Sequence, residues 1–240
     1  MIKVAVPGKA STIILTRPDA SEGFEVLMTR RSPEMRVLGG FLVFPGGGVE
    51  QEDCSENMLA RCRGLSPTEA QQILATTMTP EQSMGHWVAA VRELFEEAGI
   101  HFFVSERDSH AALASERLVE RLAKKREALS QGRLGFATLL ESEQLCCDVG
   151  RITYLFHRIT PEHHPVRFDT RFYVAALPEG QIPLAFSEEV AESVWLTPQE
   201  ALEQSESGLL PMMPPTLIAL RTLAEQKSWR NLRSAYGLGL

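Results

Sequence analysis

The chain has 240 residues, a formal net charge of −7 and a hydrophobic content of 44%. This size suits one large domain, and the negative charge argues against a general nucleic-acid binder, which would carry a basic surface. No apolar run is long enough to predict a membrane span. The four cysteines form no CxxC pair, so we expect a reducing, cytoplasmic setting.

The first half of the chain predicts strands followed by helices. Runs of β-branched and apolar residues, bounded by glycine and proline, predict strands at 10–17, 24–29 and 41–44. Capping signals then predict a mostly helical stretch over 54–91. Apolar residues at helical spacing predict a helix from His86 to Gly99, where glycine suits the left-handed conformation that ends a helix.

The second half alternates the same two kinds of element. The expected elements are a strand at 100–104, helices at 110–130 and 136–145, strands at 152–159, 168–177 and 193–196, a helix that opens at 197–200, and a helical tail from 214. Their mixed order predicts an α+β protein in which helices cover a central sheet.

Three carboxylates crowd the end of the helix that stops at Gly99. Glu93, Glu96 and Glu97 are three and four residues apart, so they share one helix face, where like charges repel. A hard divalent cation such as Mg²⁺ takes carboxylate and phosphate oxygens as ligands. The segment therefore predicts a metal site that could hold a phosphate ester. The alternative is a solvated acidic face.

A glycine-rich turn, Phe44-Pro45-Gly46-Gly47-Gly48, precedes this helix. Glycines allow the backbone to approach a metal or a phosphate closely, although a plain turn has the same composition.

Together the two segments resemble the signature of the Nudix hydrolases, G-x5-E-x7-REUxEExGU, in which U is aliphatic. Residues 92–100, RELFEEAGI, match every fixed position of its second half, and Gly47 matches its first glycine. Asp53 stands where the family usually has Glu, and 38 residues rather than seven separate it from Arg92. The resemblance implies the Nudix fold, a mixed β-sheet sandwiched between helices. We expect a single domain over 1–240, with 54–91 as a helical insertion within the box.

The resemblance also implies a diphosphate hydrolase that depends on Mg²⁺ or Mn²⁺. By this likeness, Arg92 would hold the carboxylates in place. The implied metal ligands are the carbonyl of Gly46 and the side chains of Glu93, Glu96 and Glu97.

The general base varies within the Nudix family. It is either a box glutamate or an acidic residue on the loop before the last strand. In this chain the loop spans 187–192, with Glu189 as the first choice and Glu188 as the next. A solvated acidic loop is the alternative.

Residues 27–47 resemble a signature of the coenzyme A (CoA) diphosphatases, L-L-T-x-R-[SA]-x3-R-x3-G-x3-F-P-G-G, with Met28 as the one departure. Arg31 and Arg36 would bind substrate phosphates beside Gly47 and Gly48, because guanidinium groups suit phosphate oxygens. Their alternative role is pairing with neighbouring glutamates.

The interrupted box is similar to that of the peroxisomal mammalian branch of CoA-cleaving Nudix enzymes. The resemblance thus implies a nucleotide substrate, CoA or acyl-CoA, with 3′,5′-ADP and 4′-phosphopantetheine as products. Two alternatives stay open: hydrolysis of ADP-ribose or NADH, and a non-catalytic ligand sensor. A homodimer is expected by family analogy alone.

Overall fold

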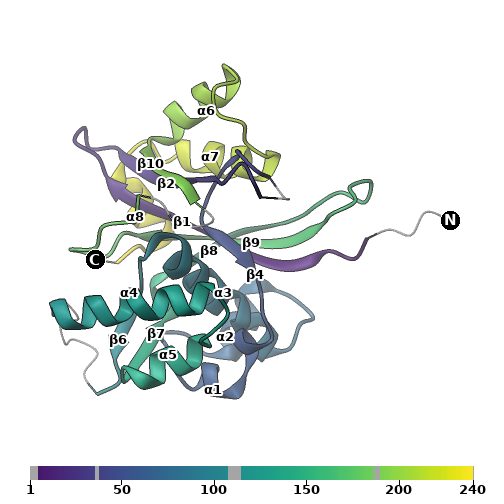
Figure 1. The fold of residues 1–240 in the computed structure, drawn as a ribbon. Coiled ribbons are helices and arrows are strands. Elements are labelled where there is room, and N and C mark those ends of the chain that lie inside the picture. Colours follow the sequence, from purple (N-terminus) through teal and green to yellow (C-terminus); the bar gives the residue numbers. More distant parts are fainter. Residues whose placement is uncertain (1–4, 36–37, 108–114, 186, 188–189, 240) are drawn as a thin grey trace.

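The structure is a computed structural model that describes residues 5–35, 38–107, 115–185, 187 and 190–239. Its centre is a mixed sheet whose described strands follow the order β10-β2-β1-β9-β8 (Figure 1). Two short strands extend it, β3 beside β2 and β4 beside β1. The strands are β1 (Gly8–Pro18), β2 (Phe24–Arg31), β3 (Leu42–Val43), β4 (Gly46–Gly48), β8 (Thr153–Ile159), β9 (Phe168–Ala176) and β10 (Val190–Leu196).

The strand β1 sits at the middle of this sheet and is buried on both faces. It runs parallel to β9, from Gly8 opposite Phe168 to Thr16 opposite Ala176, and antiparallel to β2. Alternate side chains of a strand point to opposite faces. Ile13 and Leu15 accordingly join one hydrophobic cluster, and Ile14 joins a second.

Helices cover both faces of the sheet, as Figure 1 shows. The helices α3 (Pro80–Ala98), α4 (Glu116–Ser130) and α5 (Phe136–Ser142) lie with the first cluster. On the other face lie α6 (Pro198–Glu206), α7 (Pro214–Ala224) and α8 (Trp229–Tyr236). Among the described residues, no helix is both long and apolar enough to cross a membrane.

The segment 54–91 contains more than the helices expected from its sequence. The 3₁₀ turn Glu52–Cys54 leads into α1 (Glu56–Leu59), the short strand β5 (Cys62–Arg63) and α2 (Pro67–Leu74). Ser66 and Thr79 cap α2 and α3 with the predicted capping boxes. The helix start predicted at 79–81 and the helix predicted from His86 form one helix, α3. Gly85 lies within it, at a point where a side chain would collide with the Cys54 thiol.

A second sheet includes one strand of this segment, and two of its three described strands, β5 and β7 (Leu145–Asp148), were absent from the prediction. It consists of β5, β7 and β6 (Phe103–Ser105). The helix expected over 136–145 ends at Ser142, because the chain turns at Gln144, with φ of 54°, into the buried strand β7. The strand expected over 100–104 begins only at Phe103, where pairing with Cys147 starts.

Candidate active site

The helix α3 carries the predicted carboxylates and is fixed along its whole length. Trp87, Val91 and Phe95 are almost fully buried against the sheet, and the Trp87 and Tyr173 rings lie 4.9 Å apart. The helix ends at Gly99, which adopts a left-handed φ of 71°. Because the apolar face is locked against the sheet, the positions of Glu93, Glu96 and Glu97 follow from the helix geometry.

Arg92 is the centre of the site, at 3% exposure. Its Nε and Nη2 atoms donate to the two oxygens of Asp53 at 2.9 and 3.0 Å. Its Nη1 atom donates to Glu93 and Glu96, at 2.9 Å each, and Nη2 also donates to the carbonyl of Gly48 at 2.7 Å. Burial alone would lower the Arg92 pKa, but the hydrogen bonds and charge of Asp53 raise it above its usual value. Arg92 is therefore a permanent cation that ties the helix to the glycine turn.

Asp53 takes the position of the usual family glutamate, and its contact with Arg92 joins the two ends of the long insertion. It is 1% exposed, and besides Arg92 it accepts a hydrogen bond from the Glu50 amide at 2.8 Å. Its shorter side chain reaches Arg92 with both oxygens because the 3₁₀ turn at Glu52–Cys54 packs against α3. The structure thus places this aspartate as the anchor of Arg92.

The glycine turn lies directly against the carboxylates. A Cβ atom at Gly47 would lie 2.5 Å from the carboxyl carbon of Glu93, and one at Gly46 would lie 2.7 Å from the Cα atom of Thr12. The Gly46 amide donates to Glu97 at 3.1 Å. Gly48 has open space where a Cβ atom would be, so only the first two positions need glycine for close approach.

Burial changes the protonation of the carboxylates. Desolvation raises the Glu93 pKa to about 7, although the charge of Arg92 opposes the shift. Burial raises the Glu96 pKa above its usual value in the same way. A carboxylate that is this costly to ionise favours a nearby cation, and its hard oxygen atoms suit a divalent one.

The described residues nevertheless contain no preformed group of three His, Cys, Asp or Glu side chains arranged to hold a metal ion. Here Arg92 binds Glu93 and Glu96, and the Gly46 amide binds Glu97. The metal-ligand roles of Gly46, Glu93, Glu96 and Glu97 therefore stay predictions.

The predicted substrate arginines fall partly within the described residues. Arg31, at the end of β2, has its Nη1 atom 3.9 Å from a carboxylate oxygen of Glu97. The Arg31 Nε atom is buried without a hydrogen-bond partner in the described part of the chain. Arg36 and both candidate bases, Glu188 and Glu189, lie outside the described residues.

Two further contacts of the site could not be expected from the motifs. The Arg126 guanidinium of α4 donates to the Glu96 carbonyl at 2.7 Å. The Glu52 carboxylate accepts from the Ala137 amide at 3.3 Å and so caps α5. Both join segments far apart in sequence, and no local signal marks them.

The chain is similar to known proteins over most of its length. The model of the NUDT19 Nudix domain matches residues 4–223. The acyl-coenzyme A diphosphatase NUDT19 of Xenopus laevis is 26% identical, over 83% of this chain and 60% of that protein. The protein of the same name from Homo sapiens is 27% identical, over 90% of this chain and 65% of that protein. The chain thus spans less than two thirds of the length of these relatives.

A solved structure is similar over nearly the whole chain. The crystal structure of a NUDIX hydrolase from Alicyclobacillus acidocaldarius is 26% identical and has a TM-score of 0.75. The match covers 98% of this chain and 99% of that one.

Proposed function

This chain belongs to the Nudix family, in the branch described by the NUDT19 Nudix domain, and on that premise we propose that it hydrolyses the diphosphate of CoA or acyl-CoA. The α+β Nudix fold expected from the sequence is confirmed. The products would be 3′,5′-ADP and 4′-phosphopantetheine, with any acyl group left on the latter. The observation that carries the proposal is the contact of the glycine turn with Glu93 and Glu97, next to Arg31.

Nudix hydrolases generally use divalent metal ions, and the donor set here fits one. The carboxylates of Glu97, which is buried, and of Glu93 and Glu96, which are partly buried, are hard oxygen ligands, and the raised Glu93 pKa marks a site where a cation would relieve desolvated charge. These side chains and the Gly46 carbonyl would hold Mg²⁺ or Mn²⁺. When bound, the metal would neutralise diphosphate oxygens and lower the pKa of a water molecule.

The arginines of the site divide into two roles. Arg92 is fully engaged with carboxylates and the Gly48 carbonyl, so it would orient ligands rather than contact substrate. Arg31 keeps a buried Nε donor without a partner in the described residues, so it would bind a diphosphate oxygen. Gly47 and Gly48 would let that diphosphate approach the backbone of the turn.

Activity on a set of substrates tests this proposal. We would incubate the chain with CoA, ADP-ribose, NADH or dGTP, each with Mg²⁺ or Mn²⁺, and compare kcat/KM. We expect a preference for CoA, loss of turnover on chelation, and a fall of at least about 100-fold in Glu97→Gln. Equal rates on all four compounds would refute the CoA assignment, and CoA binding without turnover in either metal would favour a ligand sensor.

The general base remains a choice between a box glutamate and the loop before β10. We propose Glu189, with Glu188 as its neighbouring control. If Glu189 is the base, Glu189→Gln lowers kcat and removes the acidic limb of the pH profile, while Glu188→Gln leaves both unchanged. The opposite pattern would assign the base to Glu188, and no effect of either would assign it to the helix.

A further inference from the structure

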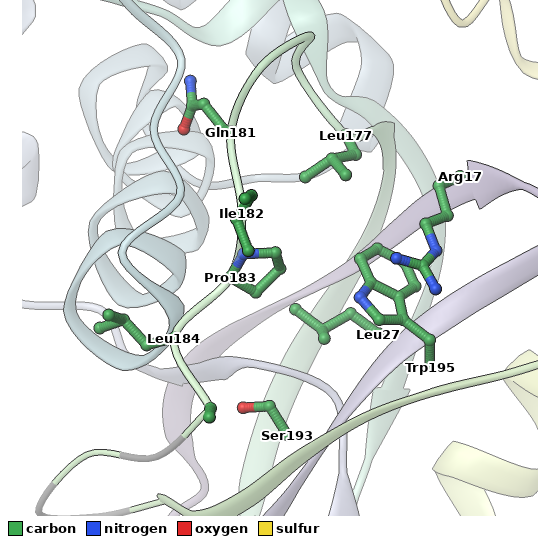
Figure 2. A pocket seen from close by; sticks show the side chains of 10 residues that line it. Arg17, Leu27, Leu177, Gln181, Ile182, Pro183, Leu184, Ser193 and Trp195 are labelled. Atoms are coloured by element: carbon green, nitrogen blue, oxygen red, sulfur yellow. The ribbon is translucent and has the colours of Figure 1, made fainter.

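A pocket of about 280 Å³ lies between the sheet and the loop that follows β9. Leu27 of β2 and Ser193 and Trp195 of β10 project into it from the sheet, and Leu177 with residues 181–185 forms the opposite wall (Figure 2). None of these residues belongs to the carboxylate cluster around Arg92.

The pocket lies on the same face of the sheet as the carboxylate cluster. Leu27 and Arg31 are four residues apart on β2, so both side chains point to this face about 13 Å from each other. Ser193 and Trp195 lie opposite Thr29 and Leu27 in the β10–β2 register. Arg31 and the pocket therefore lie on one face of the sheet, at two positions along β2.

The loop that forms the opposite wall is fixed to the catalytic helix. The Leu184 amide donates to the Ala98 carbonyl at 2.9 Å, one residue after Glu97. The Leu184 side chain packs against Gly99, where a Cβ atom would lie 3.1 Å from its Cγ atom. The wall and the carboxylates thus share one rigid support.

The lining of the pocket is mainly aliphatic, and its apolar members besides Trp195 are Leu27, Leu177, Ile182, Pro183, Leu184 and Ala185. Ile182, at the rim of the pocket, is 87% exposed. An exposed large apolar side chain beside an apolar pocket is a typical ligand contact. The Ser193 hydroxyl is buried without a hydrogen-bond partner in the described structure, which is costly unless a ligand supplies one.

The same residues argue against a nucleobase in this pocket. The Arg17 guanidinium lies over the Trp195 ring, 4.2 Å from its centroid, so one aromatic face is already covered. The Gln181 side-chain amide bonds both the amide and the carbonyl of His101. Few hydrogen-bond donors and acceptors therefore remain to bind the edge of a base. An aliphatic chain with occasional amides needs few hydrogen-bond partners.

We propose that this pocket binds the pantetheine arm of the substrate and the start of its thioester-linked acyl chain, with the Ser193 hydroxyl bonded to an arm amide. The proposal rests on the CoA diphosphatase function and extends it to acyl specificity. A pocket of this volume holds a part of the substrate rather than the whole molecule.

Calorimetric titration of the full chain with S-acyl pantetheines tests the pocket without turnover, because these probes lack the diphosphate that would be cleaved. We expect affinity to rise from S-acetyl to S-hexanoyl pantetheine, by about fourfold for each methylene that becomes buried. Ile182→Asp should weaken S-hexanoyl pantetheine binding about tenfold. Leu209→Asp is the matched control, because Leu209 is also exposed, at 71%, and lies outside the pocket; it should leave binding unchanged.

Separate outcomes would overturn the pocket and the proposed function. If CoA is cleaved but affinity is independent of acyl length, or Ile182→Asp binds like wild type, the pocket assignment is wrong. If the acyl pantetheines bind with the expected chain-length trend but CoA is not cleaved, the assignment of the apolar pocket stands and the diphosphatase function is refuted. Equal losses in Ile182→Asp and Leu209→Asp would also overturn the pocket.

Discussion

The pair formed by Asp53 and Arg92 gives the sharpest stability prediction. In Asp53→Asn, Arg92 stays charged and buried at 3% exposure but loses the carboxylate that binds two of its nitrogen atoms. Burial raises the Asp53 pKa against the opposing effect of Arg92, so the cost of burying the carboxylate offsets the attraction within the intact pair. Removing one partner is the costly change, because the buried guanidinium then keeps Glu93 and Glu96 on Nη1 but loses the carboxylate that accepts from Nε and Nη2. We expect a loss of about 3 kcal/mol in the free energy of unfolding.

Urea denaturation followed by circular dichroism at pH 7.5 measures this loss. The matched control is Glu50→Gln, because Glu50 also lies near Arg92, 3.9 Å from Nη1, but its side chain is 63% exposed. The control should cost less than about 1 kcal/mol, since water screens an exposed pair. If Asp53→Asn falls within about 0.5 kcal/mol of Glu50→Gln, the anchoring role of Asp53 is wrong.

Three further predictions concern the turn, the substrate arginine and pH. Gly47→Ala should keep the fold but lower kcat at least about tenfold, because the new methyl displaces the Glu93 carboxylate. Gly48→Ala places its methyl away from Glu93 and all other described protein atoms, so it should keep wild-type kcat and change KM for CoA alone; equal kcat values of the two variants would contradict the steric argument. Arg31→Ala should raise KM for CoA about tenfold and Arg31→Lys less, and unchanged values of KM would remove the phosphate role. Burial, helped by the charge of Arg171, lowers the His86 pKa to about 3, below its unfolded value of about 6.5. Stability from neutral His86 is complete above pH 6.5 and is lost as the pH falls toward 3, so the His86 contribution to the unfolding free energy should drop by about 1.4 kcal/mol between pH 7.5 and 5.5. It is measured as the difference between wild type and His86→Gln, because Glu93 and His101 titrate in both proteins.

The motifs predicted the contacts that depend on local geometry. Helical spacing alone places Glu93, Glu96 and Glu97 together, and a capping box marks the start of α3 at Thr79. The turn at Gly47 belongs to the Nudix signature, so Gly47 could be expected to lie against a functional group. In the structure that group is the Glu93 carboxylate.

Contacts between distant segments could not be predicted from the sequence. Asp53 reaches Arg92 across 38 residues, and nothing in either local pattern shows that the intervening chain returns to the same place. The strand β7 was missed because its four residues, Leu-Cys-Cys-Asp, follow a helical pattern directly and lack an alternation of polar and apolar side chains. The pocket beside Trp195 also depends on strand pairing, which brings β10 against β2.

The most direct test of the central claim is the identity of the bond that is cleaved. Mass spectrometry of the products from S-hexanoyl-CoA, incubated with the chain and Mg²⁺ or Mn²⁺, distinguishes the options. The account predicts 3′,5′-ADP and S-hexanoyl-4′-phosphopantetheine in equal amounts, with the thioester intact, and neither product from Glu97→Gln. Release of hexanoate and free CoA, or of inorganic phosphate, in place of these two products would contradict it.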